Sequence, residues 1–302
     1  MKSIDKELVS IGEIEEVPSG SIYDDKSFLC CKLAYFPVAD IYILGHWIVK
    51  LYRPLFLFVL FTYDLAIGIY DCLNFIPNNT WKIVFLVLLS VLNFNLLISY
   101  LSTIGHGPGY MSYNYNKVDG TEDTWYSRMS NIVTYQEQMD FAKQNERPPR
   151  ASFSVNARRY VLRADHYCYW TESWIGLKNL RYFTLTLFWS IISGVAWILS
   201  HIWWFKNEVI NFKFIHILTY VGILITIILI LFSAYYLTLS LKNLKDNITF
   251  IEKWKKTATN YKKDNCLDNF AEVCGQKKYC PFWIFPCFPF KPVEDGFYKN
   301  IN

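Results

Sequence analysis

Hydrophobic residues gather in four long runs that polar segments of unequal length separate. The runs cover about residues 54–75, 81–101, 182–205 and 214–241. Each approaches or exceeds the roughly 20 residues that an α-helix needs to cross the hydrocarbon core of a bilayer. Short links at residues 76–80 and 206–213 join the runs in pairs. The pattern predicts an all-α integral membrane protein with four transmembrane helices.

Few polar side chains interrupt these runs. Asp64 and Asp71 lie in the first run, and Asn93 and Asn95 lie in the second. An ionised carboxylate in hydrocarbon is costly, so Asp64 is expected to face the helix bundle or water. It either hydrogen-bonds a neighbouring helix or serves function directly. The two asparagines are expected to form hydrogen bonds between helices.

The runs divide the chain into five parts. These are an N-terminal segment (1–53), the first helix pair (54–101), a central loop (102–181), the second helix pair (182–241) and a C-terminal tail (242–302). All but three of the 30 Lys and Arg residues lie in the first segment, the loop and the tail. Since cytosolic segments of membrane proteins are enriched in Lys and Arg, both termini and the loop are expected to be cytosolic. The chain is expected in the endomembrane system or the plasma membrane.

Composition agrees with a bilayer location and limits the partners. Charged residues make up 19% of the chain, below the roughly 25% of an average soluble domain. The formal net charge of +4 is too small to argue for nucleic acid as a partner. The first 27 residues lack the order of a signal peptide, so the first helix is expected to act as the insertion signal.

The chain has eight cysteines and no Cys-x-x-Cys pair. Free thiols are expected in the cytosol, where disulfides are rare. Cys30 and Cys31 are either lipidation sites or ordinary thiols.

One segment of the central loop combines a thiol with acid–base groups. Asp165, His166 and Cys168 fall within four residues, and three arginines precede Cys168: Arg158, Arg159 and Arg163. A histidine can take the thiol proton, and a carboxylate can hold the ring in the useful tautomer. Nearby cations favour the thiolate. This spacing alone is weak evidence, because an isolated Asp-His-x-Cys is more often incidental.

The surrounding sequence makes the segment specific. Residues 159–170 read Arg-Tyr-Val-Leu-Arg-Ala-Asp-His-Tyr-Cys-Tyr-Trp, and residues 173–179 read Ser-Trp-Ile-Gly-Leu-Lys-Asn. They resemble the signature of the DHHC protein S-acyltransferases (palmitoyltransferases), in the Asp-His-Tyr-Cys form of a fungal branch. Further partial motifs of that family follow in its order: Gly-Pro-Gly at 107–109, Arg-Pro-Pro-Arg at 147–150, Thr-Phe-Ile-Glu at 249–252 and Asn-Phe-Ala-Glu-Val-Cys-Gly at 269–275.

The sequence departs from the family pattern at the positions of the zinc ligands. The family's loop usually folds around two zinc ions, whose ligand positions align here with Asp140, Lys143, Phe153, Ser154, Ala157, Tyr160, Tyr167 and Trp174. Most of these side chains cannot bind zinc. No zinc and no other cofactor is therefore expected. The aromatic residues among them are expected to form a small packed core instead.

The resemblance implies an enzyme, a protein S-palmitoyltransferase. Cys168 would attack the thioester of palmitoyl-CoA or another long-chain acyl-CoA. The acyl-Cys168 thioester would then pass its chain to a cysteine of a membrane-associated protein. His166 would act as general base and then as proton donor, and Asp165 would orient it. The alternative is a catalytically inactive membrane scaffold or chaperone that retains the fold. A small transporter is disfavoured by the four spans and the cysteine-centred loop.

Supporting roles follow from the same resemblance. The CoA phosphates need cations, for which the candidates are Arg147, Arg150, Arg158, Arg159, Arg163, Lys178 and Arg181. Each can equally be an ordinary membrane-flanking charge. Trp170 is placed at the acyl entrance or, alternatively, as an interfacial anchor.

Residues of the helices and the tail complete the expected site. Ser193, beside Gly194, aligns with the position where the fatty tail ends, so small side chains there favour longer chains; alternatively, they permit close helix packing. Thr249 and Glu252 are expected to brace the loop. Asn269 is expected to hold the tail's backbone against the spans.

Overall fold

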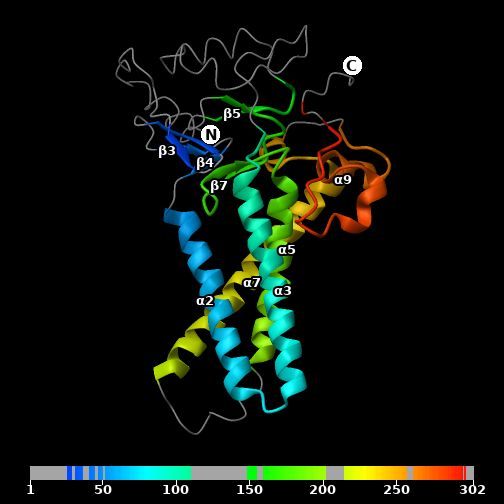
Figure 1. The fold of residues 1–302 in the computed structure, drawn as a ribbon. Coiled ribbons are helices and arrows are strands. Elements are labelled where there is room, and N and C mark those ends of the chain that lie inside the picture. The colour runs from blue at the N-terminus through cyan, green and yellow to red at the C-terminus, as the bar shows by residue number, and fades with distance from the viewer. Residues whose placement is uncertain are drawn as a thin grey trace. The chain divides into compact units, whose positions relative to one another are not determined.

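The computed structural model describes residues 26–28, 31–36, 41–44, 47–49, 52–109, 148–154, 159–201, 214–256, 261–294 and 296 (Figure 1). The chain divides into two compact units. The loop unit contains Met1–Lys50, Ile104–Asn179 and Glu294–Asn302, and the helix unit contains Leu51–Thr103 and Leu180–Val293. The lipidation candidates Cys30 and Cys31 lie outside the residues whose side chains are described.

Four long helices dominate the structure. They are α2 (Tyr52–Phe75), α3 (Asn79–Gly105), α5 (Leu180–Ser200) and α7 (Phe214–Asp246). Each is long and apolar enough to cross a membrane, which confirms that the four hydrophobic runs form helices. The tight turn between α2 and α3 ends at Asn78, whose Oδ1 accepts the backbone N–H groups of Thr80 and Trp81 at 2.8 and 3.2 Å. This side chain therefore caps α3.

The expectation of an all-α protein is wrong in detail, because the mostly helical structure also contains short strands. Strands β1 (Lys26–Phe28), β2 (Cys31–Phe36), β3 (Ile41–Leu44) and β4 (Trp47–Val49) form an antiparallel sheet in chain order. In the loop unit, β5 (Ser152–Ser154) pairs with β6 (Arg159–Val161), and β7 (His166–Cys168) pairs with β8 (Ser173–Ile175). Aromatic and β-branched residues favour such strands, but runs this short leave little trace in a hydropathy pattern.

Small and hydroxyl-bearing residues line the contact between α5 and α7. Thr184 Oγ1 lies 2.8 Å from Ser240 Oγ, and Ser190 Oγ donates to Ser233 Oγ at 2.6 Å. Further along, a Cβ on Gly194 would lie only 2.9 Å from Ile230 Cγ1. Gly194 therefore permits the close approach of the two helices, as small residues commonly do within membranes.

The two asparagines of α3 do not form the expected bonds between helices. Asn93 Nδ2 donates to Leu89 O at 2.9 Å, and Asn95 Nδ2 donates to Val91 O at 2.8 Å. Both acceptors lie four residues earlier in the same helix. That carbonyl is the nearest available partner for a short polar side chain on a helix.

Acidic residues of α2 do make contacts with other helices. The backbone oxygen of Asp64 accepts Trp197 Nε1–H of α5 at 2.6 Å, and its carboxylate lies toward Thr226 of α7. Asp71 Oδ2 lies 2.7 Å from Nε2 of His201, and both side chains are buried. Both aspartates thus face the bundle, which is where charged groups within membranes are tolerated.

The tail folds against the end of α7. It contains α8 (Phe250–Trp254), α9 (Cys266–Cys274) and the short 3₁₀ helix η3 (Lys277–Phe282). The buried Asn269 side chain donates to Lys245 O at 2.9 Å and Lys263 O at 3.0 Å, and accepts Lys263 N–H at 2.8 Å. This one amide therefore ties α9 to the last turn of α7.

Candidate active site

The β7–β8 hairpin carries the predicted nucleophile. His166 pairs across the hairpin with Ile175, and Cys168 pairs with Ser173. Successive side chains of a strand point to opposite faces, so residues two apart share a face. His166 and Cys168 therefore project to the same side of the hairpin, whereas Tyr167 projects to the other. The His-x-Cys spacing places both side chains on one face because this segment is a strand.

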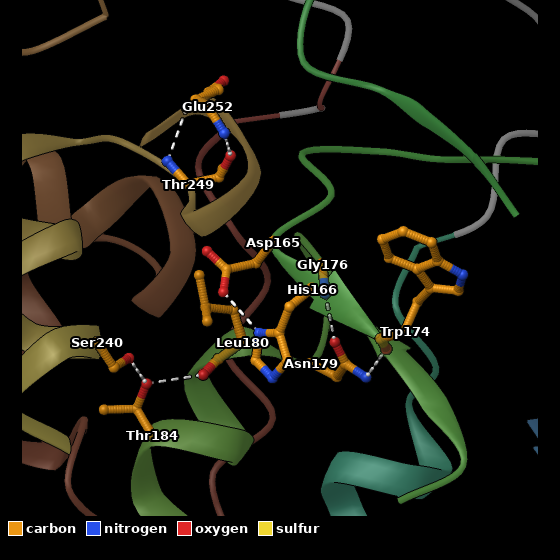
Figure 2. A network of polar contacts seen from close by, with 10 residues as sticks. All are labelled: Asp165, His166, Trp174, Gly176, Asn179, Leu180, Thr184, Ser240, Thr249 and Glu252. Carbon is orange, nitrogen blue, oxygen red and sulfur yellow. Dashed lines mark hydrogen bonds and ion pairs between the residues drawn. The ribbon is translucent and has the colours of Figure 1, made fainter. Parts of the chain in front are cut away.

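An acid–base relay leads from Asp165 to the thiol. Asp165 Oδ2 lies 2.8 Å from Nδ1 of His166 (Figure 2). The imidazole interacts with Cys168 strongly enough to lower the pKa of its thiol. With the Nδ1 proton held by Asp165, the other ring nitrogen, Nε2, is the one that can exchange a proton with the thiol.

The electrostatics of this relay favour a charged pair. Burial lowers the pKa of His166, but the hydrogen bonds and negative charges of Asp165 and Cys168 outweigh it and raise the pKa to about 9. Burial raises the pKa of the Cys168 thiol, yet hydrogen bonds from His166 and Thr171 and the imidazolium charge bring the pKa below its ordinary value. Both directions stabilise a thiolate beside an imidazolium at neutral pH.

Thr171 is a site residue that sequence reasoning missed. Its side chain is buried, and Oγ1 donates to the backbone oxygen of Cys168 at 3.3 Å. Hydrogen bonding by Thr171 also lowers the pKa of the Cys168 thiol. A hydroxyl three residues after the nucleophile, within the turn of a hairpin, is the only trace of this role in the sequence. The turn itself brings the two residues together.

Two aromatic side chains at the tip of the hairpin are exposed. Tyr169 and Trp170 are 64% and 43% exposed. Trp170 therefore lies at the surface, two residues beyond the nucleophile. Both of its predicted roles, flanking the acyl entrance and anchoring the chain at the membrane interface, require an exposed side chain.

The Gly176-x-x-Asn179 motif forms a hydrogen-bonded turn directly after β8. Asn179 Oδ1 accepts Gly176 N–H at 2.8 Å, and Nδ2 donates to Trp174 O at 2.9 Å (Figure 2). A Cβ on Gly176 would lie 2.6 Å from Pro108 O, so no side chain fits there. Lys178 N–H donates to the same oxygen of Pro108 at 3.3 Å. The Gly-Pro-Gly turn at 107–109 thus packs against the base of the hairpin.

Aromatic pairs stand at four of the positions that align with zinc ligands. Phe153 and Tyr160 are direct cross-strand partners whose ring centroids lie 5.5 Å apart, edge to face. Tyr167 and Trp174 repeat this arrangement in the second hairpin at 6.1 Å. Tyr167 also donates its hydroxyl to Glu172 Oε2 at 2.9 Å.

These side chains do not fit a zinc ion. Zinc requires four ligands drawn from thiolates, imidazoles and carboxylates. No group of three such residues that could hold a metal occurs in the described part of the chain. Asp140, Lys143 and Ala157, the other aligned positions apart from Ser154, lie outside it.

The predicted CoA-binding cations have different environments. Arg147, Arg158 and the side chain of Arg159 lie outside the described residues. Arg150 is 5% exposed and Arg163 is completely buried, so neither guanidinium faces solvent. Lys178 is exposed, and it remains the candidate among the described loop residues.

Arg181 has a role that the sequence did not indicate. Its guanidinium is buried at the start of α5 and donates to the backbone oxygens of three tail residues, Trp283, Phe285 and Phe288, at 2.7–3.2 Å. A group occupied in this way is a structural tie and not a free phosphate ligand. Backbone acceptors carry no sequence signature, so the sequence cannot indicate this tie.

The remaining predicted residues lie in the helix unit. Thr249 caps α8: its Oγ1 accepts Glu252 N–H at 3.2 Å, while Glu252 Oε2 accepts Thr249 N–H at 2.7 Å (Figure 2). This reciprocal pair is a capping box. The expectation that it braces the loop stays a prediction. Ser193 is buried on α5, and its contact with an acyl chain stays a prediction as well.

Comparison with known proteins finds similarity to one family of enzymes. Residues 133–257 match the family model described as DHHC palmitoyltransferase. Probable protein S-acyltransferase 12 of Arabidopsis thaliana is 24% identical over 210 residues, which cover 66% of this chain and 72% of the relative. Probable protein S-acyltransferase 14 of the same plant is 26% identical over 219 residues, covering 67% and 71%. Palmitoyltransferase pfa3 of Emericella nidulans is 24% identical over 251 residues, covering 76% and 44%.

Proposed function

Since the family match and these relatives support the DHHC family and an acyltransferase enzyme, we propose that this multi-pass membrane protein is a protein S-palmitoyltransferase. It takes a long fatty acyl chain from acyl-CoA and transfers it, through a thioester on Cys168, to cysteines of membrane-associated proteins. The observation that carries the proposal is the relay from Asp165 through His166 to the Cys168 thiol, with its 2.8 Å carboxylate–imidazole contact.

The first half of the reaction loads the enzyme. The Cys168 thiolate attacks the carbonyl carbon of the acyl-CoA thioester, and a new sulfur–carbon bond forms. The bond from that carbon to the CoA sulfur then breaks. His166, which begins as an imidazolium, gives its proton to the departing CoA sulfur. Asp165 holds the ring in place throughout and stabilises its charged form.

The second half transfers the chain. Neutral His166 takes the proton of a substrate cysteine, whose sulfur attacks the carbonyl carbon of acyl-Cys168. The Cys168–carbon bond breaks, and Cys168 leaves as a thiolate beside the newly formed imidazolium. The starting state is thereby restored without a net change in protons on the enzyme. Thr171 donates hydrogen bonds to the Cys168 sulfur whenever it carries negative charge.

The loop is proposed to hold this geometry without zinc. The paired rings of Phe153 with Tyr160 and of Tyr167 with Trp174 join the strands at the aligned positions. Edge-to-face aromatic pairs of this kind contribute about 0.5–1.5 kcal/mol each beyond their burial. The Tyr167–Glu172 hydrogen bond adds a polar tie at the turn.

The residues that bind acyl-CoA are proposed from the charge and hydrophobicity of their side chains. Lys178, together with Arg147, Arg158 and Arg159, is proposed to bind the CoA phosphates. Trp170 is proposed to flank the acyl chain as it enters the bilayer, and Ser193 to lie at its far end. The excess of Lys and Arg in the loop and both terminal segments supports a cytosolic active site.

Acyl loading of purified protein tests the proposal. Incubation with palmitoyl-CoA should raise the intact mass by one acyl group, and neutral hydroxylamine should remove it. Peptide mapping should find the group on Cys168, and Cys168→Ser should carry none. Cys287→Ser is the matched control, since Cys287 is exposed but lies outside the site, and it should load normally. A scaffold without activity predicts no adduct in any of these proteins.

A further inference from the structure

One segment of the tail exposes an unusual amount of apolar surface. Residues 279–290 contain no charged side chain, and lysines flank them on both sides. Five large side chains in this segment are 37–47% exposed: Tyr279, Phe282, Ile284, Phe285 and Phe288. We call residues 279–290 the aromatic loop. A contiguous apolar patch of this kind on a protein surface marks an interaction site.

The aromatic loop is fastened to α5, one of the membrane-spanning helices. Arg181 donates to the backbone oxygens of Trp283, Phe285 and Phe288 at 2.7–3.2 Å. Trp189 Nε1–H donates to Ile284 O at 3.0 Å. The guanidinium carbon of Arg181 also lies 5.0 Å from the ring centroid of Phe290.

These contacts indicate how deep the loop lies. Arg181 and Trp189 are eight residues apart on α5, which corresponds to roughly 12 Å along the helix axis. The loop therefore follows the span from its first turn towards its middle, and Ile284 is the residue anchored furthest along it. In Figure 1 this segment is the orange-to-red chain that follows α9. The loop therefore lies beside the first half of a helix that is long and apolar enough to cross a membrane.

Many backbone polar groups of the aromatic loop have hydrogen-bond partners within the protein and do not need water. Four of its carbonyl groups accept bonds from α5 side chains. Trp283 N–H and Phe285 N–H donate to Cys280 O and Phe282 O, each at 3.1 Å. Three prolines, at 281, 286 and 289, have no N–H to satisfy. Non-helical chain is tolerated at membrane depth only where its polar groups are satisfied in this way.

We propose that the aromatic loop inserts its exposed face into the lipid bilayer, at the membrane surface where α5 begins. Its partner is the boundary between lipid headgroups and acyl chains, where aromatic side chains are enriched. The exposed Lys278 and Lys291 extend their charged ends towards the headgroups while their stems remain against apolar surface. The loop thereby sets the depth of the α5 start in the bilayer, independently of acyl transfer.

Two exposed cysteines make a matched test. Cys287 lies on the aromatic loop, and Cys266 lies at the start of α9. Variants that keep only one of these thiols, with the other cysteines changed to serine, are labelled with an environment-sensitive fluorophore in phosphatidylcholine nanodiscs. A nitroxide near the top of the lipid acyl chain should quench the Cys287 label severalfold more than the Cys266 label. Aqueous iodide should show the reverse order. Equal quenching of both labels by iodide overturns the proposal, and so does a Cys287 label that neither quencher reaches, because protein then covers the loop.

A second measurement avoids any effect of the fluorophore. The rate at which a charged maleimide modifies unlabelled Cys287 in nanodiscs should be severalfold below the rate for Cys266. Ile284→Asp should raise the Cys287 rate, because a carboxylate draws the loop towards water. Leu267→Asp is the control, since Leu267 on α9 is 45% exposed and Ile284 is 46% exposed, and it should leave that rate unchanged. Equal starting rates at the two thiols contradict insertion.

Discussion

His166 Nδ1 and Asp165 Oδ2 lie 2.8 Å apart although the two residues are neighbours in the sequence. Neighbouring side chains of a regular strand point to opposite faces, but Asp165 precedes the first residue of β7. Its own N–H donates to Ile175 O at 2.8 Å, which fixes its backbone at the edge of the hairpin. From that position the carboxylate meets the ring, and the ring's other nitrogen remains for Cys168.

His166→Ala should move the pH dependence of acyl loading to higher pH. The hydrogen bond and charge of His166 lower the pKa of the Cys168 thiol, so their loss returns the thiol towards its ordinary value. Loading by the unaltered enzyme should rise as pH passes the lowered thiol pKa and should decline above about 9, where His166 loses its proton. Single-turnover loading from pH 5 to 10 measures both limbs. An unchanged profile in the variant removes His166 from the relay.

Asp165→Asn should move the rising limb of the same profile to higher pH. The hydrogen bond and charge of Asp165 raise the pKa of His166. With a neutral amide in its place, the imidazolium loses its proton at lower pH, and the Cys168 thiol becomes less acidic. The decline at high pH should also begin earlier than in the unaltered enzyme. A variant that loads more slowly without any change in profile indicates that Asp165 acts only through folding.

Thr171→Val should slow loading while Thr171→Ser should not. Valine has nearly the shape of threonine but lacks the hydroxyl that bonds Cys168. A hydrogen bond to a charged group contributes about 1.5–3 kcal/mol, which corresponds to roughly a 10- to 100-fold rate loss. Its rising limb should also move to higher pH, a change that a purely structural defect does not produce. Equal rates for the two variants contradict a role of the hydroxyl.

Chelators should leave activity and stability intact, because the aligned side chains do not fit zinc. Elemental analysis of purified protein should find well below one zinc per chain. Trp174→Ala should lower the melting temperature, since it removes the ring that packs on Tyr167 at 6.1 Å. Trp254→Ala is the control, because Trp254 lies on α8 and is 55% exposed, and it should have little effect. Stoichiometric zinc would falsify the metal-free loop.

Ser193→Phe should shift the preference from stearoyl-CoA towards palmitoyl-CoA or shorter chains. Each buried methylene contributes about 0.8 kcal/mol, so a blocked site loses this gain for the longer chain. Val195→Phe on the same helix is the control, since Val195 is 44% exposed whereas Ser193 is 4% exposed. Competition between the two acyl-CoA substrates measures the preference. If the folded, active Ser193 variant keeps its original preference, Ser193 serves helix packing alone.

The amino-acid sequence was sufficient for the four spans and for the residues of the relay. Hydropathy adds up along a single segment, so α2, α3, α5 and α7 can be recognised without knowledge of their neighbours. Motif residues such as Asp165, His166 and Cys168 are likewise identified by type and spacing. The unsuitability of Tyr167 and Trp174 as zinc ligands is a property of the side chains themselves.

Other features depend on which groups meet in space. The hairpin turn brings Thr171 to the thiol, and strand geometry places His166 and Cys168 on one face. Arg181 binds the carbonyl oxygens of residues about a hundred positions later, while Asn93 and Asn95 bond within their own helix. Every residue carries the same backbone acceptor, so no pattern of side chains can specify which carbonyl a polar group will choose. That choice follows only from the folded contacts.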